Sequence, residues 1–283
     1  MSLHTNSATH AATTLEAFDE EWLEWHAAHE RNRAHPHGFL AVTHLHWLSS
    51  EATRLEGAPG TWSADDDVVR VVLEPGESLL QDGVELNSDA GKSLELGPIE
   101  ERGGINLVSG DTVIEVAKRG GEYIVRPRNP ENQLLKQYQG TPAYTPNAAF
   151  AVAGRFVPFE TPRATTVGAA VEGIQHVYEA PGEIRFKLAG KELALTAFNG
   201  YAPGSLSVLF TDQTSGKTTY AANRSLSVVP AADGTVQLDF NRAVNLPCAY
   251  TDLATCPLPP AENRLPVAIE AGEKIPYERQ DQK

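Results

Sequence analysis

The stretch that decides the fold is Leu238-Asp-Phe-Asn-Arg-Ala-Val-Asn-Leu-Pro-Cys-Ala-Tyr250, which continues through Cys256-Pro-Leu-Pro-Pro-Ala-Glu-Asn-Arg-Leu-Pro266. Neither the 3.6-residue period of a helix nor the two-residue period of a strand runs through it. Its prolines remove backbone donors, and its Asn and Asp side chains favour turns because they bond to the nearby backbone. It also carries more large apolar residues than a disordered tail would hold. We therefore predict a fixed, irregular loop over residues 238–274 that packs across a β scaffold.

The residues before this loop show the alternation that is typical of strands. Residues 183–188 and 193–198 alternate apolar and polar side chains around Ala-Gly-Lys-Glu, and this pattern predicts a hairpin. Residues 112–118 and 122–126 flank Arg-Gly-Gly and predict a second one. Further strands are predicted at 149–156, 165–171, 175–178, 205–210, 218–221, 225–229 and 236–240. The predicted fold is mainly β, with two packed antiparallel β units that are sandwich or barrel-like.

One long helix is predicted, near the N-terminus. Thr13-Thr-Leu-Glu16 has the pattern of a capping box, and Phe18, Trp22 and Trp25 follow at helical spacing. Residues 1 to about 12 are interpreted as a flexible leader, and His35-Pro-His-Gly38 ends the helix. We divide the chain into a leader, helix and apolar segment at 1–60, an N-terminal β unit at 61–145, and a C-terminal β unit with the loop at 146–283.

Composition excludes several classes of partner. The net charge of −14 argues against nucleic acid and anionic membranes, because both require an excess of Lys and Arg on one face. There is no apolar run long enough to span a membrane, and the first residues lack the pattern of a signal peptide. Two cysteines are too few for a disulfide framework. We expect a cytoplasmic protein, and the oligomeric state is not predicted.

Several motifs resemble the DUF1684 family of conserved bacterial proteins. They are Asp239-Phe-Asn-Arg-Ala-Val-Asn245, Pro247-Cys-Ala-Tyr250, Thr255-Cys-Pro-Leu-Pro-Pro260, Glu262-Asn-Arg-Leu-Pro266, Ala271-Gly-Glu-Lys274, and Phe210-Thr-Asp-Gln-Thr-Ser-Gly-Lys-Thr-Thr-Tyr220 followed by Arg224. Gly38-Phe-Leu-Ala-Val-Thr-His-Leu-His-Trp-Leu48 resembles a further segment of the family, with His44 and His46 where small and aromatic residues are more usual. The resemblance implies a fold family and no established activity.

A set of polar residues in and before the loop forms the candidate site. Two interpretations are open. In the first, Arg224 anchors an anionic ligand through its planar fork, and Asp239 orients Arg224 or acts as a base. In the second, the polar groups only satisfy the buried backbone of the loop. Asp212 and Glu273 belong to the same set. The predicted ligand-binding residues are Tyr220, Arg224, Asp239, Asn241, Asn245 and Asn263.

Other candidate chemistry receives less support. His44 and His46 share one face of a strand, as zinc ligands can, but no third ligand is evident, so we predict no metal site. Cys248 and Cys256 are either structural thiols or, beside a cation such as Arg242 or Arg264, a nucleophile. Local motifs of serine hydrolases, zinc proteases and dinucleotide-binding proteins are absent. No cofactor is assigned.

These observations favour a small anionic ligand in a cleft beside the C-terminal loop, with no reaction assigned. One alternative is a non-catalytic interaction module, because the first β unit, with its short strands and Asp-Gly turns, is similar to phosphopeptide-binding sandwiches in pattern. Another alternative is a flavin-binding split barrel, since such barrels bind their cofactor without a local motif.

Overall fold

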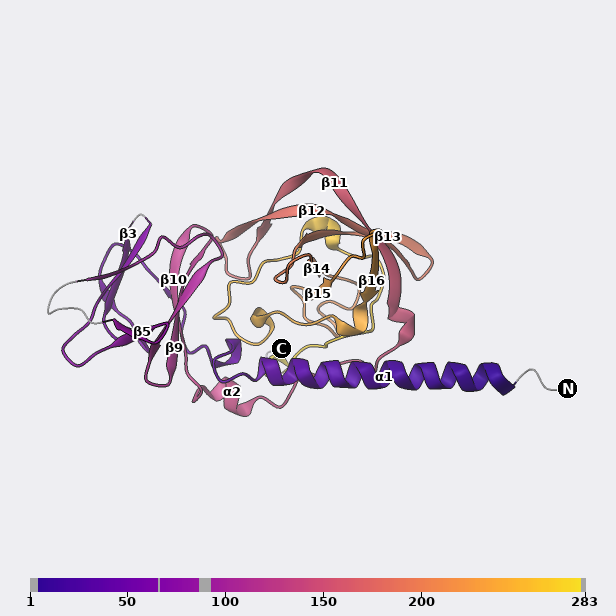
Figure 1. Ribbon diagram of the computed structural model, residues 1–283, viewed down its shortest axis with the longest axis horizontal. Helices are drawn as coiled ribbons and strands as arrows, with labels where there is room; N and C mark the ends of the chain where they lie inside the picture. The colour runs from indigo at the N-terminus through magenta and orange to yellow at the C-terminus, as the bar shows by residue number, and fades with distance from the viewer. Residues whose placement is uncertain (1–4, 66, 87–92, 281–283) are drawn as a thin grey trace. The chain divides into compact units, whose positions relative to one another are not determined.

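The computed structural model describes residues 5–65, 67–86 and 93–280 (Figure 1). The fold is mainly β with antiparallel sheets and one long N-terminal helix, as predicted. The sequence Asp89-Ala-Gly91, which predicts a turn, lies outside the described residues. Two compact units are present. The C-terminal unit comprises Met1–Arg31, Gly140–Tyr250 and Cys256–Lys283, and the N-terminal unit comprises Asn32–Gln139 and Thr251–Thr255.

The N-terminal unit contains two antiparallel sheets around one core. One sheet has the order β1-β10-β9-β8-β5-β6 and the other the order β2-β3-β4-β7. Both sheets contribute buried side chains to the same cluster, such as Trp62 and Val71 from one sheet and Ile114 from the other. The strands are β1 His46–Trp47, β2 Thr53–Arg54, β3 Thr61–Asp65, β4 Val68–Val72, β5 Leu79–Gln81, β6 Val84–Leu86, β7 Leu94–Leu96, β8 Gly104–Ser109, β9 Thr112–Arg119 and β10 Glu122–Arg128. The predicted β9–β10 hairpin is confirmed, with Glu122 opposite Arg119.

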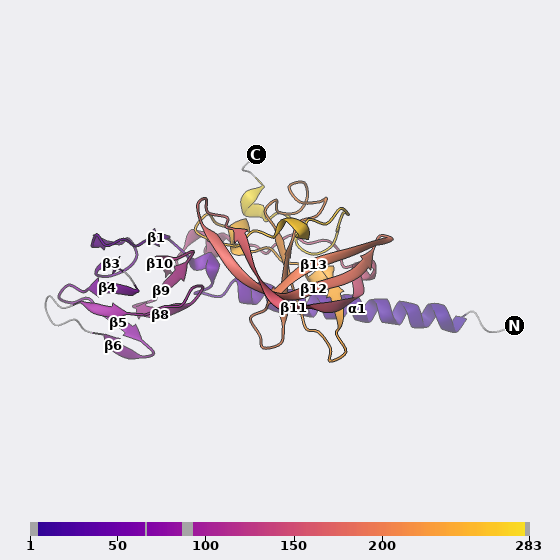
Figure 2. The same cartoon turned by 90° about the horizontal axis from the view of Figure 1, so that it is seen from above.

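The C-terminal unit is built on one six-stranded antiparallel sheet of order β15-β14-β13-β12-β11-β16. Figure 2 shows β11, β12 and β13 side by side and strongly curved. The strands are β11 Ala151–Gly168, β12 Gln175–Leu188, β13 Lys191–Asn199, β14 Leu206–Phe210, β15 Arg224–Val228 and β16 Thr235–Asp239. The predicted hairpin of residues 183–198 is confirmed as part of β12 and β13. Buried side chains such as Ile184, Leu195 and Leu238 form the core of this unit.

Two strands of this sheet, β11 and β12, are longer than predicted. The predicted strands 149–156 and 165–171 belong to the single strand β11, and 175–178 and 183–188 belong to β12. The β11–β12 register shifts between Pro158 and Arg163, so β11 continues through both Pro158 and Pro162. The strand predicted at 218–221 is wrong. That segment is a turn in which Gly216 has φ +77° and Ser215 forms an isolated bridge with Thr219.

Helix α1 spans Thr5–Arg33 and so begins eight residues before the predicted start at Thr13. Of the predicted leader, residues 1–4 lie outside the described part and the rest is helical. The capping-box pattern therefore lies inside the helix, because no Pro or Gly interrupts the chain from Thr5 to Arg33. Trp22 is buried, and its Nε1 donates to the backbone oxygen of Asn241 at 2.8 Å. No helix among the described residues is long and apolar enough to cross a membrane.

The C-terminal loop is ordered and irregular, as predicted. It contains three short 3-10 turns, η3 Phe240–Arg242, η4 Pro247–Ala249 and η5 Ala261–Asn263, and η6 Tyr277–Arg279 follows it. The short helix α2 Gln133–Gln137 and the 3-10 turns η1 Phe39–Ala41 and η2 Ala148–Phe150 complete the described elements. Leu265, Val267 and Ile269 are buried in the same core as the sheet. The loop therefore supplies one wall of the core of the C-terminal unit.

Gly182 in β12 provides a test of this packing. A Cβ at this position would meet the Val157 backbone oxygen and would lie 2.6 Å from Phe156 Cε2. We expect Gly182→Ala to lower the free energy of unfolding by about 1–3 kcal/mol, because the added methyl overpacks the β11–β12 contact. The matched control is Gly168→Ala in β11, where the nearest atom would be Leu258 Cδ1 at 3.4 Å. Equal stability of the two variants in urea titrations would contradict the close packing.

Candidate functional site

The most deeply buried charges of the predicted site are Arg224 and Asp212. Their side chains are 1% and 0% exposed, and Arg224 Nη2 donates to Asp212 Oδ2 at 2.8 Å. Arg224 also donates to the backbone oxygens of Ile269 at 3.0 Å and of Ala271. Burial lowers the pKa of Arg224, and the carboxylate of Asp212 opposes this effect. The guanidinium therefore joins the sheet to the irregular loop.

Asp212 continues the same network into the turn that follows β14. Its Oδ1 accepts hydrogen bonds from the backbone nitrogens of Thr214 at 2.8 Å and Ile269 at 3.2 Å, and from Thr214 Oγ1 at 2.7 Å. The buried pair is thus compensated by directed hydrogen bonds as well as by charge.

The three predicted asparagines also bond to the backbone. Asn263 Nδ2 donates to the oxygens of Thr196 at 2.9 Å and Leu209 at 2.8 Å, and its Oδ1 accepts from Thr196 N at 2.8 Å. The backbone nitrogen of Asn147 donates to Asn241 Oδ1 at 2.8 Å, and Asn241 Nδ2 donates to the backbone oxygen of Asn147 at 3.0 Å. Asn245 Nδ2 donates to Lys274 O at 2.8 Å. These side chains replace the ladder partners that an irregular loop lacks.

The Tyr220 side chain also bonds to the backbone of the loop. Its hydroxyl donates to the backbone oxygen of Cys248 at 2.9 Å, and burial raises its pKa to about 12. Tyr220, Arg224 and the three asparagines therefore make the contacts that the second interpretation expects. Their direct role in ligand binding stays a prediction.

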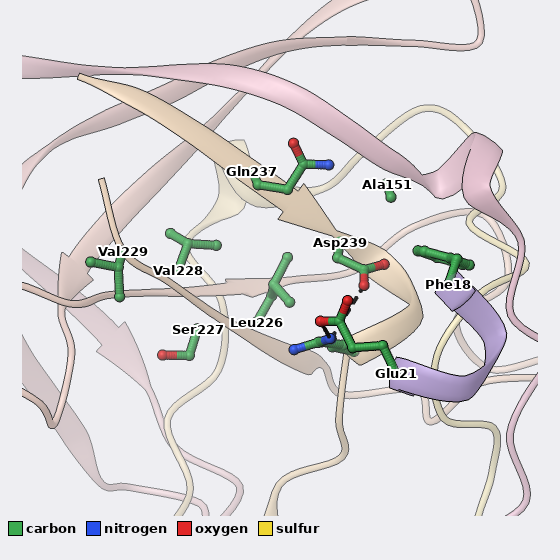
Figure 3. Close-up of a pocket in the computed structure, with 10 residues that line it drawn as sticks. Phe18, Glu21, Ala151, Leu226, Ser227, Val228, Val229, Gln237 and Asp239 are labelled. Carbon is green, nitrogen blue, oxygen red and sulfur yellow. Dashed lines mark hydrogen bonds and ion pairs between the residues drawn. The ribbon is translucent and has the colours of Figure 1, made fainter. Parts of the chain in front are cut away.

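Asp239, the remaining predicted residue, lines a cleft of about 410 Å³ that we refer to as the edge cleft. Figure 3 shows Asp239 from β16 and Glu21 from α1 with their carboxylates turned toward one another, and Leu226 and Val228 from β15 beside them. The remaining lining is mixed polar and apolar. The complete lining is Phe18, Glu21, Ala151, Leu226, Ser227, Val228, Val229, Gln237, Asp239 and Arg242.

The edge cleft lies between the two edges of the six-stranded sheet. β15 and β16 are the end strands in the sheet order, so each has a strand partner on one side only. Ser225 exchanges both backbone hydrogen bonds with Val244, at 2.8 and 2.9 Å, on the side facing away from β14. By strand alternation, the backbone groups of Ser227 point to that same side. An unpaired strand edge offers N–H and C=O groups to a ligand.

Arg242 was not predicted as a ligand-binding residue. Its Nη2 lies 2.5 Å from Glu21 Oε1, its Nε lies 3.3 Å from Asp239 Oδ2, and its guanidinium lies 5.5 Å from the centre of the Trp25 ring. The Nε–H is buried and makes no hydrogen bond within the part of the chain that the structure describes, because the approach to Asp239 lacks hydrogen-bond geometry. The signal in the sequence was the Asp-Phe-Asn-Arg spacing, which places Asp239 and Arg242 together across η3.

The paired histidines lie in the N-terminal unit, away from these residues in the chain. The rings of His44 and His46 stack with centroids 5.5 Å apart. His46 Nε2 lies 2.9 Å from the backbone oxygen of Glu56, and His44 Nε2 lies 3.4 Å from its carboxylate. No cluster of three or more His, Cys, Asp or Glu side chains with metal-site geometry occurs in residues 5–65, 67–86 and 93–280.

Comparison with known proteins gives a family and no activity. The family model described as "Protein of unknown function (DUF1684)" matches residues 136–274. Among solved structures, the chain is similar to the uncharacterized protein from gene locus rrnAC0354 of Haloarcula marismortui, with 30% identity, a TM-score of 0.42, and coverage of 51% of this chain and 80% of that chain. No curated protein matches.

The different environments of Arg224 and Arg242 lead to a testable difference in stability. Arg224→Met leaves Asp212 buried without its cation, so we expect a loss of about 3–5 kcal/mol in the free energy of unfolding. Arg242→Met removes partly exposed ion pairs with Glu21 and Asp239 and should lower the free energy of unfolding by no more than about 1 kcal/mol. Thermal and urea unfolding measure both. A wild-type stability for Arg224→Met would contradict the structural role of the pair.

Proposed function

The chain belongs to the DUF1684 family, which carries no assigned function, and we propose that it binds a small organic anion in the edge cleft. No reaction is part of the proposal. The observation that carries it is the position of Arg242, a guanidinium inside a cleft, with a buried Nε–H that makes no hydrogen bond to any described residue. A planar guanidinium matches the two oxygens of a carboxylate.

The walls of the edge cleft support an organic ligand over a simple ion. Phe18, Leu226, Val228 and Val229 contribute apolar surface, and Val229 is 70% exposed. The volume of about 410 Å³ falls in the range of known small-molecule pockets. A molecule with an apolar body and one carboxylate would bury this surface and reach Arg242.

Glu21 currently occupies the position that the ligand carboxylate would take. It is 70% exposed, so its ion pair with Arg242 is weak and is readily exchanged. Asp239 is better held, because its Oδ1 accepts from Asn241 N at 3.0 Å and from Asn241 Nδ2 at 2.7 Å. In the proposal, Asp239 keeps the guanidinium in place, and the ligand displaces Glu21.

The buried polar residues take a supporting role in this proposal. Asn241 fixes the turn that contains Arg242, and Arg224 holds the loop behind it. The four N–H···O contacts that Arg224 makes with described residues go to Asp212 or to loop carbonyls. Its side chain is 1% exposed whereas that of Arg242 is 31% exposed, so we assign the anchoring role to Arg242. Asp239 is then the predicted site residue that faces the ligand.

Binding of hydrocinnamate, hexanoate and benzoate by isothermal titration calorimetry tests the proposal. We expect at least one of these carboxylates to bind, while hydrocinnamamide, which lacks the charge, does not. Arg242→Met should weaken binding by at least about tenfold, since a charge-assisted hydrogen bond contributes about 1.5–3 kcal/mol. Arg185→Met, which removes an exposed guanidinium from β12 in the same sheet, should leave binding unchanged.

Glu21→Gln gives a prediction of opposite sign. It removes the competing carboxylate, so we expect tighter binding, by about two- to fivefold, as the release of a pair worth up to ~1 kcal/mol allows. Glu24→Gln, on the same helix and outside the cleft lining, changes the net charge equally and should have no effect. Binding of the amide as well as the acid, preference for phenethylamine, or no binding by any of the three carboxylates would contradict the proposal.

A further inference from the structure

The two cysteines of the chain lie against each other in the C-terminal unit. Cys248, in η4, and Cys256 are both buried thiols, 3% and 8% exposed. The backbone nitrogen of Cys248 donates to Cys256 Sγ at 3.3 Å. Each cysteine is adjacent to a proline, Pro247 or Pro257, which restricts the backbone around it. The fold thus brings together two sulfur atoms whose residues are separated by seven others in the sequence.

The surroundings of Cys248 stabilise a thiolate. Hydrogen bonds from the Cys256 thiol and the Tyr220 hydroxyl, together with the nearby Arg279 guanidinium, lower the pKa of Cys248 although burial opposes the shift. Tyr220 Oη and Arg279 Nη2 both donate to the Cys248 backbone oxygen, at 2.9 and 3.3 Å, which places them beside this residue. A hydroxyl and a guanidinium on the backbone of Cys248, with the second cysteine beside it, form a site that a merely space-filling thiol does not require.

We propose that Cys248 and Cys256 form a redox-active dithiol that a small hydroperoxide oxidises to a disulfide. The Cys248 thiolate attacks the terminal peroxide oxygen, an S–O bond forms, and the O–O bond breaks. The leaving alkoxide or hydroxide takes a proton from water. The sulfur has then lost two electrons and is a sulfenic acid.

Cys256 completes the reaction. Its thiol loses a proton to solvent, and its sulfur attacks the sulfur of the Cys248 sulfenic acid, so that an S–S bond forms and hydroxide leaves as water. The net change converts two thiols and one hydroperoxide into a disulfide, an alcohol and a water. The contact of Cys248 N with Cys256 Sγ, at 3.3 Å, shows that the second sulfur already lies against the residue that carries the first.

This site is separate from the edge cleft, because neither cysteine nor Tyr220 or Arg279 lines that cleft. The smallest hydroperoxide is close to water in size, so a narrow path from the surface to the buried thiols is sufficient. Tyr220 and Arg279 are half-buried, so the site is adjacent to the surface. The proposal also gives Tyr220 a specific task, because its hydroxyl holds the backbone of Cys248 at 2.9 Å and so fixes the residue that carries the attacking sulfur.

The test treats the full-length, reduced protein with a slight excess of hydrogen peroxide. The products are quenched in denaturant with N-ethylmaleimide and measured by intact-mass spectrometry. We expect an intramolecular disulfide, seen as the loss of two hydrogens and of both alkylation sites. It should form at least about tenfold faster near pH 7 than in the same chain unfolded in urea, because the fold lowers the pKa of the Cys248 thiol and holds Cys256 beside it. Equal rates, or protection of the folded thiols, would overturn the proposal.

Two variants separate the roles of the residues. Cys256→Ser should leave Cys248 as a sulfenic acid that dimedone traps, while Cys248→Ser should react no faster than the unfolded chain. Tyr220→Phe retains the ring and should slow the wild-type reaction several-fold and move its pH midpoint upward. Circular dichroism checks that each variant is folded. Equal trapping at both cysteines, or an unchanged pH midpoint in Tyr220→Phe, would contradict the assigned roles.

Discussion

The ion pair between Arg224 and Asp212 is the interaction on which the C-terminal unit depends. Both side chains are removed from water, and charges in that position are tolerated only when they are paired and hydrogen-bonded. The irregular loop meets this requirement because its carbonyls at Ile269 and Ala271 have no strand partner of their own. The guanidinium of Arg224 therefore bonds to the Asp212 carboxylate and also to two backbone carbonyls of the loop. These bonds hold the loop, which forms one wall of the core, in place.

The edge cleft and the dithiol both follow from this wall. The turn η3 is fixed by the bonds of Asn241 to Asn147, and its backbone accepts from Trp22, so Arg242 is held between α1 and the strand edges. Further along the loop, Tyr220 bonds to Cys248 and holds the thiol pair against the same wall. A loop that was not anchored would position neither the guanidinium nor the two sulfurs.

The sequence was informative where a pattern has a single physical meaning. The hairpins, the mainly β fold and the ordered loop followed from alternation, turn residues and retained apolar surface. The lengths of β11 and β12 were not predicted, because the sequence does not show that β11 stays paired with β12 across a register shift between Pro158 and Arg163. Arg242 was missed because its position in a cleft depends on α1, which meets it only in the folded chain. The cysteine pair was visible in the sequence, but the hydrogen bond from the Cys248 backbone to the Cys256 sulfur was not.

Native-state hydrogen exchange of the loop amides measures the central claim directly. The amide of Ile269 bonds to Asp212, that of Leu265 bonds to Thr211, and that of Glu273 bonds to Ala243. If the loop is a fixed wall, these amides exchange only through global unfolding, with the same free energy and urea dependence as core amides such as Leu195. Exchange of the three loop amides through a local opening of low free energy, while Leu195 remains protected, would contradict the account.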